Sequence, residues 1–360
     1  MRILIATGGS GGHIFPALHV AEKLKAGGHE VTFVTTPGKV TQAIVGRGFP
    51  VRMISSRGFS LKSPASFFMS LGCMGIALVQ SLKILIAVKP QRVVGFGGYG
   101  AFPVVLMGAL IKRPTLIHEQ NVIPGRANRV LAKFAGRIAL SFRESEKYFP
   151  SEKTVFTGCP CRMRTAGLNK ESLFKKFGLE SSRVTILVLG GSQGSRRINT
   201  EFLAAAPLLK NEIAFQAIHV SGESGYPSLK EQYARLKIPH HLSDFLNNID
   251  EAYEIADLVI SRSGAVTVCE IAAFSLAAIL IPYPYAGGHQ KENAKILEKE
   301  KTACMIEENN LSAEVLKNTV LKILKENMSK DEIARRLAHV IAFDSAQKIA
   351  HEIETLTPQP

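Results

Sequence analysis

The sequence is poor in cysteine, and its few cysteines are not spaced like the ligands of a zinc site. There are five, and only Cys159 and Cys161 lie close together; the others are Cys73, Cys269 and Cys304. A single C-x-C without a second pair is a weak zinc signal. An odd number of cysteines in a chain of 360 residues indicates reduced thiols and a cytosolic setting.

The usual signatures of secretion and of dinucleotide or P-loop binding are also missing. Residues 1–7 lead straight into a strand and a glycine-rich turn, without the apolar core of a signal peptide. No Gly-Lys-Ser/Thr follows the glycine turns at 8–12 and 190–194, and Ile14 occupies the third glycine position of G-x-G-x-x-G. Residues 35–36 are threonines, where a dinucleotide enzyme would place an acid for the ribose. A dehydrogenase is therefore disfavoured.

Negative charge is scarce relative to positive charge. Lys and Arg total 44 against 30 Asp and Glu, which gives a net charge of +14. This excess favours an anionic partner, which can be nucleic acid, a phosphate-bearing substrate or acidic lipid, or it serves solubility alone. Aromatic residues make up only 7% and the basic residues are dispersed, which disfavours a non-catalytic module that binds nucleic acid.

What the sequence does contain is globular composition and an alternation of strands and helices. The chain is longer than the roughly 250–300 residues at which single cores stop growing, so two domains are expected. Alternating elements predict parallel sheets covered by helices. The expected strands are residues 2–6, 30–35, 93–95, 115–118, 138–140, 154–157, 184–189 and 258–260; expected helices include 16–25, 101–110 and one from about Arg196.

The second half of the chain repeats the opening of the first. A strand at 2–6 precedes Gly-Gly-Ser-Gly-Gly at 8–12, and a strand at 184–189 precedes Gly-Gly-Ser-Gln-Gly at 190–194. We therefore expect two Rossmann-like domains, joined near residues 158–167, where glycines and a proline interrupt the pattern.

Glycine clusters follow three of the expected strands, at residues 8–12, 95–100 and 190–194. Glycine lets backbone N–H groups approach a phosphate, and the helix that follows adds partial positive charge at its N-terminus. A single such turn also serves tight packing. Three at equivalent strand ends indicate binding of phosphate or pyrophosphate.

Several polar residues are candidates for a site. His13, at the mouth of the first glycine loop, is either a general base or a structural helix cap. The polar residues 118–121 directly follow a strand and are expected to point into a cleft. Residues 265–268 open a helix that can hold phosphate, and Glu270 could accept both hydroxyls of a ribose. Gln290 carries a donor and an acceptor, as recognition of sugar hydroxyls requires.

Residues 63–82 carry no charge over about the length of a bilayer span. Serines, a proline and a glutamine within them favour a partly buried helix with an exposed apolar patch, although a spanning helix and a simple core helix remain alternatives. The flanking Lys62, Lys83, Lys89 and Arg92 are typical of a surface that docks on anionic lipid.

Six motifs in order carry a family resemblance, which extends from Arg2 to about Ile306. They resemble the MurG family, the undecaprenyldiphospho-muramoylpentapeptide β-N-acetylglucosaminyltransferases of bacterial peptidoglycan synthesis. The motifs are Gly-Gly-Ser-Gly-Gly-His-Ile-Phe-Pro-Ala (8–17), Gly-Phe-Gly-Gly-Tyr (95–99), His-Glu-Gln-Asn (118–121), Gly-Gly-Ser-Gln-Gly (190–194), Ser-Gly-Ala-Val-Thr-Val-Cys-Glu (263–270) and His-Gln-x-x-Asn-Ala (289–294).

The resemblance implies an α/β GT-B fold, in which two Rossmann-like domains with parallel sheets face a central cleft. Residues 1–160 would bind the acceptor and the membrane, and residues 161–341 would bind UDP-GlcNAc. A C-terminal helix at about 342–360 is expected to return to the first domain.

The resemblance also implies roles for individual residues. His13 and Glu119 are the catalytic candidates, with His13 as base. The acceptor pyrophosphate would lie on Gly8, Gly9, Gly97, Gly98 and Tyr99. The residues implied for UDP-GlcNAc are Ser10, Gly11, Gly12, Asn121, Arg162, Ser192, Leu246, Ala265, Val266, Thr267, Val268, Cys269, Glu270 and Gln290.

By the same resemblance the enzyme would transfer GlcNAc from UDP-GlcNAc to the C4 hydroxyl of lipid I, with inversion, at the cytoplasmic face of the bacterial inner membrane. Other proteins of cell-wall synthesis are further candidate partners, and nucleic acid is not expected. The chain contains no Asp-x-Asp pair, which argues against a metal-chelating glycosyltransferase. No cofactor is therefore expected to be required, although a divalent cation could assist.

Three positions depart from the family pattern. Cys159 stands where Asn is usual, Cys269 where Ser is common, and residues 287–288 are glycines in a stretch that is often acidic. The alternative functions are another GT-B glycosyltransferase or a UDP-sugar epimerase, which would need more acidic residues around the sugar than these motifs offer.

Overall fold

The protein is described by a computed structural model that covers residues 1–38, 41–56, 64–164, 167–191, 194–285, 287–340, 342 and 344–357, with the backbone alone for residues 64–68. The chain forms two compact units. The N-terminal unit comprises Met1–Cys161 and Ala342–Pro360, and the C-terminal unit comprises Arg162–Ile341.

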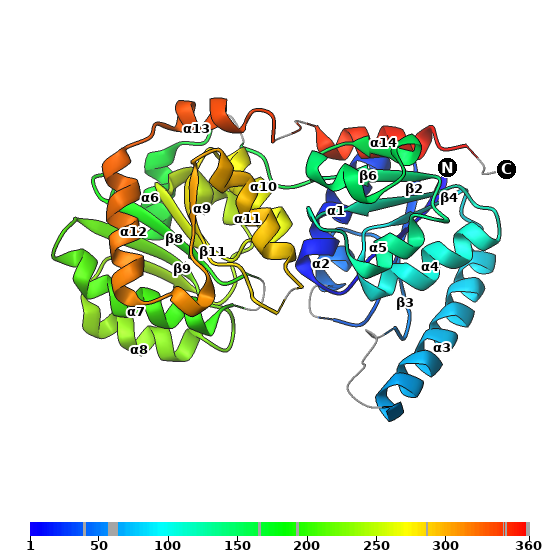
Figure 1. The fold of residues 1–360 in the computed structure, drawn as a ribbon, viewed down its shortest axis with the longest axis horizontal. Helices are drawn as coiled ribbons and strands as arrows, with labels where there is room; N and C mark the ends of the chain where they lie inside the picture. Colours follow the sequence, from blue (N-terminus) through cyan, green and yellow to red (C-terminus); the bar gives the residue numbers. More distant parts are fainter. Residues whose placement is uncertain are drawn as a thin grey trace. The chain divides into compact units, whose positions relative to one another are not determined.

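The N-terminal unit is built on a seven-stranded parallel sheet in the order β3-β2-β1-β4-β5-β6-β7 (Figure 1). Its elements are β1 Arg2–Ala6, α1 Gly11–Ala26, β2 Glu30–Thr35, α2 Thr41–Val45, β3 Val51–Met53, α3 Pro64–Val88, β4 Arg92–Gly95, α4 Gly98–Leu110, β5 Thr115–Glu119, α5 Arg126–Leu131, β6 Arg137–Leu140, the 3-10 turns Arg143–Tyr148 and Ser151–Lys153, β7 Thr154–Phe156 and α14 Ser345–Glu354.

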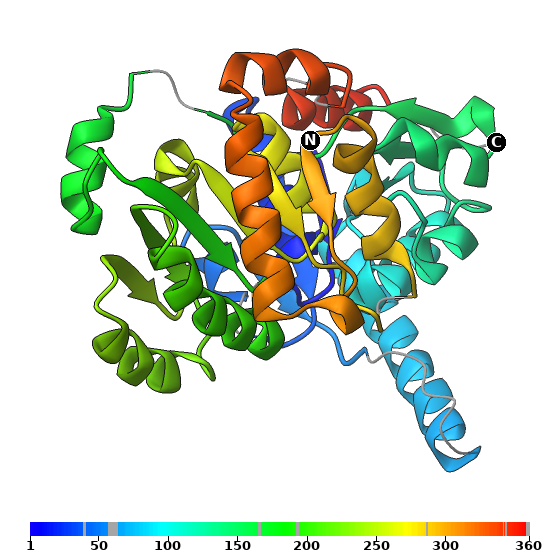
Figure 2. The same ribbon diagram turned by 60° about the vertical axis from the view of Figure 1, so that its left-hand side comes forward.

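The C-terminal unit has a six-stranded parallel sheet in the order β10-β9-β8-β11-β12-β13, with α12 packed beside α7 (Figure 2). Its elements are α6 Lys170–Phe177, β8 Val184–Leu189, α7 Arg196–Lys210, β9 Phe215–Val220, α8 Tyr226–Leu236, β10 His240–Ser243, α9 Ile249–Ile255, β11 Leu258–Ser261, α10 Ala265–Ala273, β12 Ala277–Leu280, α11 His289–Lys299, β13 Ala303–Met305, the 3-10 turn Glu308–Asn310, α12 Ala313–Glu326 and α13 Lys330–Leu337.

Strand β1 shows why the N-terminal sheet is covered on both faces. Ile3 and Ile5 pack into one buried cluster with α1, whereas Leu4 and Ala6 pack into another with α4. Successive side chains of a strand point to opposite faces, so an uninterrupted apolar run requires a layer of helices on each side. Two parallel sheets of this kind confirm the expected fold class.

The C-terminal segment of the chain completes the core of the N-terminal unit. Helix α14 packs along α1, and its Ile349, Ala350 and Ile353 are fully buried in the same cluster as the α1 side chains (Figure 1). Glu354 accepts a hydrogen bond from His29 Nε2 at 3.0 Å, provided that this ring nitrogen carries the proton. Gly158 approaches this segment closely, because a Cβ there would lie 2.5 Å from the Ala342 side chain.

Two helices begin earlier than the sequence pattern predicted, which corrects the expected starts at residues 16 and 101. Helix α1 begins at Gly11 and α4 at Gly98, with Pro16 and Pro103 inside them. Glycine runs indicated turns, but glycines can also form a helix's first turn. The glycine loops are therefore shorter than expected, and the N-termini of these helices lie inside them.

Candidate functional site

In the N-terminal unit, two glycine loops meet where the strand order reverses. Strands β1 and β4 are neighbours although five elements separate them in the chain, and ligands bind parallel sheets at such switch points. The Gly8 N–H donates to the Gly97 carbonyl oxygen at 2.9 Å. Gly97 and Gly98 have φ of +79° and +76°. A Cβ on Gly98 would lie 2.8 Å from Gly8 Cα, so this close approach requires glycine.

The imidazole of His13 lies against this pair of loops. Its atoms would be 3.2 Å from a Cβ on Gly8 and 3.0 Å from one on Gly97, so the glycines leave room for the ring. Ser10 Oγ lies 2.7 Å from His13 Nδ1, and the Ser10 hydroxyl does not cap the backbone of α1. Burial lowers the pKa of His13 to about 4, so the ring is neutral at pH 7.

The expectation that residues 118–121 all point into a cleft is wrong for the first three, because His118, Glu119 and Gln120 are buried within the unit. Glu119 Oε1 accepts from the Asn121 N–H at 2.9 Å, and Oε2 accepts from the Gly125 N–H at 3.0 Å and from Asn128 Nδ2 at 2.9 Å. Burial raises the pKa of Glu119 and these hydrogen bonds oppose the rise. Glu119 therefore organises its own loop.

Gln120 and His118 connect that loop to the second glycine cluster. Gln120 Nε2 donates to the Phe96 carbonyl oxygen at 2.9 Å and to His118 Nδ1 at 3.2 Å. His118 Nδ1 is thus an acceptor, and its Nε2 bears the proton beside Ser141 Oγ at 3.1 Å. Burial lowers the pKa of His118 to about 4. Of the remaining candidates here, Tyr99 has a half-exposed side chain and a carbonyl oxygen that accepts from Ser56 Oγ at 2.8 Å.

The C-terminal unit repeats this architecture. Strands β8 and β11 are neighbours across a reversal of strand order, so the loops that follow them share one edge of the sheet. Gly194 has φ of +78° and packs on the turn after β9, where a Cβ would lie 2.2 Å from the Ser221 carbonyl oxygen. Ser192, predicted to bind the phosphates, lies outside the described residues.

Helix α10 starts directly after the β11 loop, at Ala265, and has no acidic residue in its first turn. Helices α1 and α4 share this feature. The positive end of each helix dipole is therefore not neutralised by a carboxylate of its own first turn, which suits an anion. Among the predicted contact residues of α10, Val266 and Thr267 are half-buried, and the others are buried: Ala265, Val268, Cys269 and Glu270.

The buried carboxylate of Glu270 is held from two sides. Arg162 Nη1 donates to Glu270 Oε1 at 3.2 Å, and Tyr253 Oη donates to Oε2 at 3.3 Å. Burial raises the pKa of Glu270, and Arg162 and Tyr253 oppose the rise. Arg162 Nη2 also donates to the Asn247 carbonyl oxygen at 3.3 Å. Arg162 thereby connects Glu270 to the loop that contains the half-buried Leu246.

Gln290, predicted to contact the sugar, is the second residue of α11. Its Oε1 accepts from the Tyr283 N–H at 2.9 Å, and its carbonyl oxygen accepts from Ser263 Oγ at 2.8 Å. Gln290 therefore joins the β12–α11 loop to the β11 loop. The departure at residues 287–288 lies beside it, and both glycines have positive φ, 59° and 80°.

Four further residues shape these loops and were missed by sequence reasoning. Asn128 and Tyr253 contact the two predicted glutamates, and Arg262 forms an ion pair with Glu308. Asn199 donates to the Ser221 carbonyl oxygen at 2.9 Å and thus supports the turn under Gly194. The available signal was an asparagine among the first four residues of a helix, as at Asn128 in α5 and Asn199 in α7.

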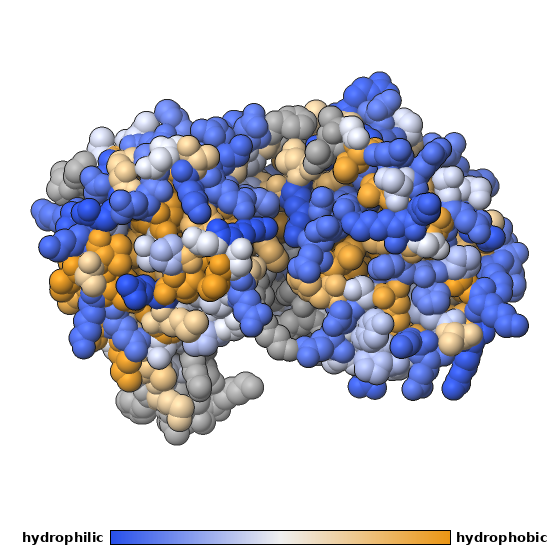
Figure 3. Space-filling view, turned by 180° about the vertical axis from the view of Figure 1, so that it is seen from behind, coloured by the Kyte–Doolittle hydropathy of each residue, from blue (hydrophilic) through white to orange (hydrophobic). Residues whose placement is uncertain are grey.

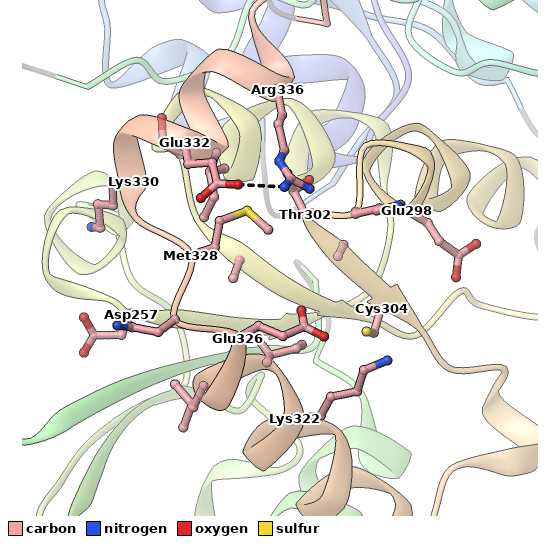
Figure 4. A pocket seen from close by; sticks show the side chains of 18 of the residues that line it. Asp257, Glu298, Thr302, Cys304, Lys322, Glu326, Met328, Lys330, Glu332 and Arg336 are labelled. Atoms are coloured by element: carbon pink, nitrogen blue, oxygen red, sulfur yellow. Dashed lines mark hydrogen bonds and ion pairs between the residues drawn. The ribbon is translucent and has the colours of Figure 1, made fainter.

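A separate pocket of about 700 Å³ opens where strands β11 and β13 begin, at the opposite end of the strands from the candidate site loops (Figure 4). Asp257 and Thr302, which precede β11 and β13, line it together with Met328 and Lys330. Arg336 Nη2 donates to Glu332 Oε1 at 2.6 Å within it. None of the described candidate site residues lines this pocket, so it is distinct from the candidate site.

Over the described residues, His, Cys, Asp and Glu form no group of three that could hold a metal ion.

Helix α3 presents an apolar face to the surface (Figure 3). Its segment Met69–Val88 is long and apolar enough to span a membrane, yet only 22% of it is buried, so a simple core helix is ruled out. Ser70, Met74, Ala77, Ser81 and Leu85 form its buried stripe. The exposed apolar residues on the other side, which we call the α3 patch, are Met69, Leu71, Ile76, Val79 and Ile86.

Two parallel-sheet units, each with a glycine loop at its switch point, place the chain in the GT-B class of glycosyltransferases. Residues 3–140 match the glycosyltransferase family 28 N-terminal domain, and residues 185–353 match the glycosyltransferase family 28 C-terminal domain. The chain belongs to glycosyltransferase family 28.

Two relatives that are similar to this chain over nearly its whole length carry the same name. A protein of Thermodesulfovibrio yellowstonii is 42% identical over 94% of this chain and 92% of its own length. One of Halothermothrix orenii is 38% identical, over 94% and 93%. Each is named UDP-N-acetylglucosamine--N-acetylmuramyl-(pentapeptide) pyrophosphoryl-undecaprenol N-acetylglucosamine transferase. The crystal structure of Acinetobacter baumannii MurG superposes with a TM-score of 0.77 at 25% identity, covering 99% of each chain.

Proposed function

We propose that this protein transfers GlcNAc from UDP-GlcNAc to the C4 hydroxyl of the muramyl sugar of lipid I, which yields lipid II and UDP in peptidoglycan synthesis. The single observation that carries the proposal is the pair of switch-point loops. One brings His13 to a junction of glycines, and the other leads to the start of α10 and the buried Glu270. The names of the full-length relatives support the substrates.

On the donor side, Glu270 would accept hydrogen bonds from the ribose hydroxyls, and Leu246 with residues 265–268 would hold the uracil. Ser192 would bind the diphosphate and Gln290 the sugar hydroxyls. Ser10, Gly11, Gly12, Asn121 and Arg162 would complete the donor contacts. The N-terminus of α10, without an acid in its first turn, supports this assignment.

On the acceptor side, Gly8, Gly9, Gly97, Gly98 and Tyr99 would bind the pyrophosphate of the lipid. The close approach of Gly8 and Gly98 supports this role, because side chains there would separate the loops. The N-termini of α1 and α4 lie within these glycine runs.

The reaction is a displacement with inversion at the anomeric carbon. The acceptor oxygen forms the new bond, its proton passes to the base, and the bond to the UDP oxygen breaks with its electron pair remaining on UDP. Backbone N–H groups and helix N-termini would stabilise the developing charge on UDP. We propose that no metal is required and that a divalent cation could assist.

His13 suits the role of base if its Nδ1–H donates to Ser10 Oγ, because Nε2 then keeps its lone pair. A pKa of about 4 alone would make it a weak base. An acceptor pyrophosphate bound to the adjoining glycine loops would place negative charge nearby and raise this pKa. We assign Glu119 a positioning role, because its carboxylate orders the loop of Asn121 and Gly125.

The α3 patch would dock the protein on the cytoplasmic face of the inner membrane, where lipid I is held. The net charge of +14 and the neighbouring Lys83, Lys89 and Arg92 support attraction to anionic lipid. Other cell-wall synthesis proteins would be further partners at that surface.

Transfer of radiolabelled GlcNAc from its UDP form to a synthetic muramyl-pentapeptide lipid tests the function. We expect labelled disaccharide lipid, and free UDP only when the acceptor is present. An acceptor-independent conversion of UDP-GlcNAc into its epimer would instead indicate an epimerase and would refute the proposal.

A further inference from the structure

Tyr253 holds one oxygen of the Glu270 carboxylate and does so as a rigid donor. Its side chain is 1% exposed, and its ring stacks on Phe274 with centroids 5.2 Å apart and an interplanar angle of 30°. Its hydroxyl lies 3.3 Å from Glu270 Oε2. The ring comes from α9 and the carboxylate from α10, so the contact joins two elements of the C-terminal unit.

The two donors to Glu270 differ in how firmly they are held. Arg162 is the first residue of the C-terminal unit and reaches Oε1 with a long side chain, which is 17% exposed. Tyr253 has only two side-chain torsions, and packing fixes both. A carboxylate offers about four acceptor positions, and Arg162 and Tyr253 already occupy some of those of Glu270. The Tyr253 hydroxyl therefore fixes which positions of Oε2 stay open to other donors.

From this arrangement we propose that Tyr253 is a positioning residue that orients the Glu270 carboxylate toward the vicinal hydroxyls of a nucleotide ribose. It thereby sets the preference for ribonucleotide over deoxyribonucleotide. The inference rests on the proposed role of Glu270 as the ribose ligand. Without the Tyr253 hydroxyl the carboxylate can turn about its own torsions, and the two ribose hydroxyls no longer find both acceptors in place.

The chain provides a matched control in Tyr233. Its side chain is also 1% exposed and in the same unit, but its hydroxyl lies 3.0 Å from His219 Nδ1 and does not contact Glu270. Tyr253→Phe and Tyr233→Phe each remove one buried hydroxyl and keep the ring. A general loss of packing affects both variants alike, whereas an effect through Glu270 appears only in Tyr253→Phe.

The experiment measures the affinity of the full chain for UDP and for 2′-deoxy-UDP by calorimetry. For Tyr253→Phe we expect the preference for UDP to fall about tenfold, the size of one hydrogen bond to a charged group. KM for UDP-GlcNAc should rise with kcat nearly unchanged. For Tyr233→Phe the preference should stay within twofold of the unaltered chain.

A double-mutant cycle shows whether Tyr253 acts through Glu270. In a Glu270→Gln background, adding Tyr253→Phe should leave the UDP preference unchanged, because coupled residues are not additive. If Tyr253→Phe does not fold, Phe274→Leu keeps the hydroxyl but loosens the ring, and should lower the preference about threefold.

The outcomes separate the inference from the proposed function. A Tyr253→Phe protein with an unchanged preference, or an equal loss in Tyr233→Phe, overturns the role of Tyr253 and leaves the role of Glu270 intact. An unaltered chain that binds UDP and 2′-deoxy-UDP equally overturns the ribose role of Glu270, and the inference with it.

Discussion

At the scale of single residues, His13 is a neutral imidazole that lies against the backbone of Gly8 and Gly97. This approach is possible because glycine has no Cβ. This placement suits a group that must accept a proton from a substrate bound at these loops. A neutral ring accepts a proton, whereas a ring already protonated cannot.

We predict that His13→Ala lowers kcat by about 10²–10⁴-fold, the usual contribution of a general base, and largely spares affinity for UDP-GlcNAc. In the unaltered enzyme, kcat should fall as the pH drops through the His13 pKa of the acceptor complex, since protonation removes the base. Steady-state kinetics with both substrates, against pH, measures this. An equal loss in affinity and turnover would instead give His13 a binding role.

Gly98 tests the close approach of the two loops. Gly98→Ala would place a Cβ 2.8 Å from Gly8 Cα at a φ of +76°, so we expect destabilisation of at least about 1–2 kcal/mol and loss of transfer. Gly72→Ala in α3, where a Cβ meets nothing within 4 Å, should stabilise by about 0.5–1 kcal/mol. Chemical denaturation measures both, and equal stability of the two variants would contradict the prediction.

The sequence identified the candidate functional residues better than it identified the residues that surround them. The motifs pointed to Glu119 and Glu270 as functional carboxylates, but not to Asn128, Arg162 and Tyr253 as the groups that hold them. A carboxylate at a strand end or in a helix looks the same in sequence whether it faces substrate or its own loop. Only the contacts made across elements distinguish the two cases. The individual site roles stay predictions.

At the scale of elements, helix α3 combines a narrow buried stripe with an apolar outer face (Figure 3). The stripe follows the helical repeat, because Ser70, Met74, Ala77, Ser81 and Leu85 are spaced by three or four residues. Ile84 and Val88 pack partly against the core, whereas the side chains of the α3 patch lie outside the described core clusters. An apolar face of this size marks an interaction surface.

We predict that replacing Ile76 and Val79 together by Glu weakens binding to vesicles of anionic phospholipid by at least about tenfold, because each apolar side chain contributes about 1.5–3 kcal/mol when it is fully buried. Each side chain is 56% exposed, so folding should be preserved. Val315→Glu, at a 40% exposed position of α12, is the control and should bind as the unaltered protein does. Vesicle co-sedimentation reports binding; an unaffected double variant would locate the membrane surface elsewhere.

At the scale of the whole molecule, each unit contains a buried neutral histidine beside its loops. Burial lowers the pKa of His118 in the N-terminal unit to about 4 and of His219 in the C-terminal unit to about 3. Unfolding restores ordinary pKa values, so the unfolded chain binds more protons below about pH 6.5. Stability contributed by these groups is therefore lost as the pH falls from about 6.5 toward about 4.

We predict that each histidine steepens this loss by up to about 1.4 kcal/mol per pH unit. Glu119 and Glu270 act in the opposite direction, because burial raises their pKa values and the folded state then gains protons first. Comparison with His219→Gln isolates one histidine. Denaturation between pH 4 and pH 7 should show a shallower acid loss for this variant, and parallel curves would contradict the prediction.

The sequence by itself determined the class of fold, because short uninterrupted apolar strands that alternate with helices, with glycine turns at their ends, leave a parallel, helix-covered sheet as the way to bury them. It also determined the family, through six motifs that occur together and in order. The tertiary structure decided where helices α1 and α4 begin, that Glu119 serves its own loop, and which donors hold Glu270. These outcomes depend on contacts between segments far apart in the chain, and local residue preferences carry no record of such partners.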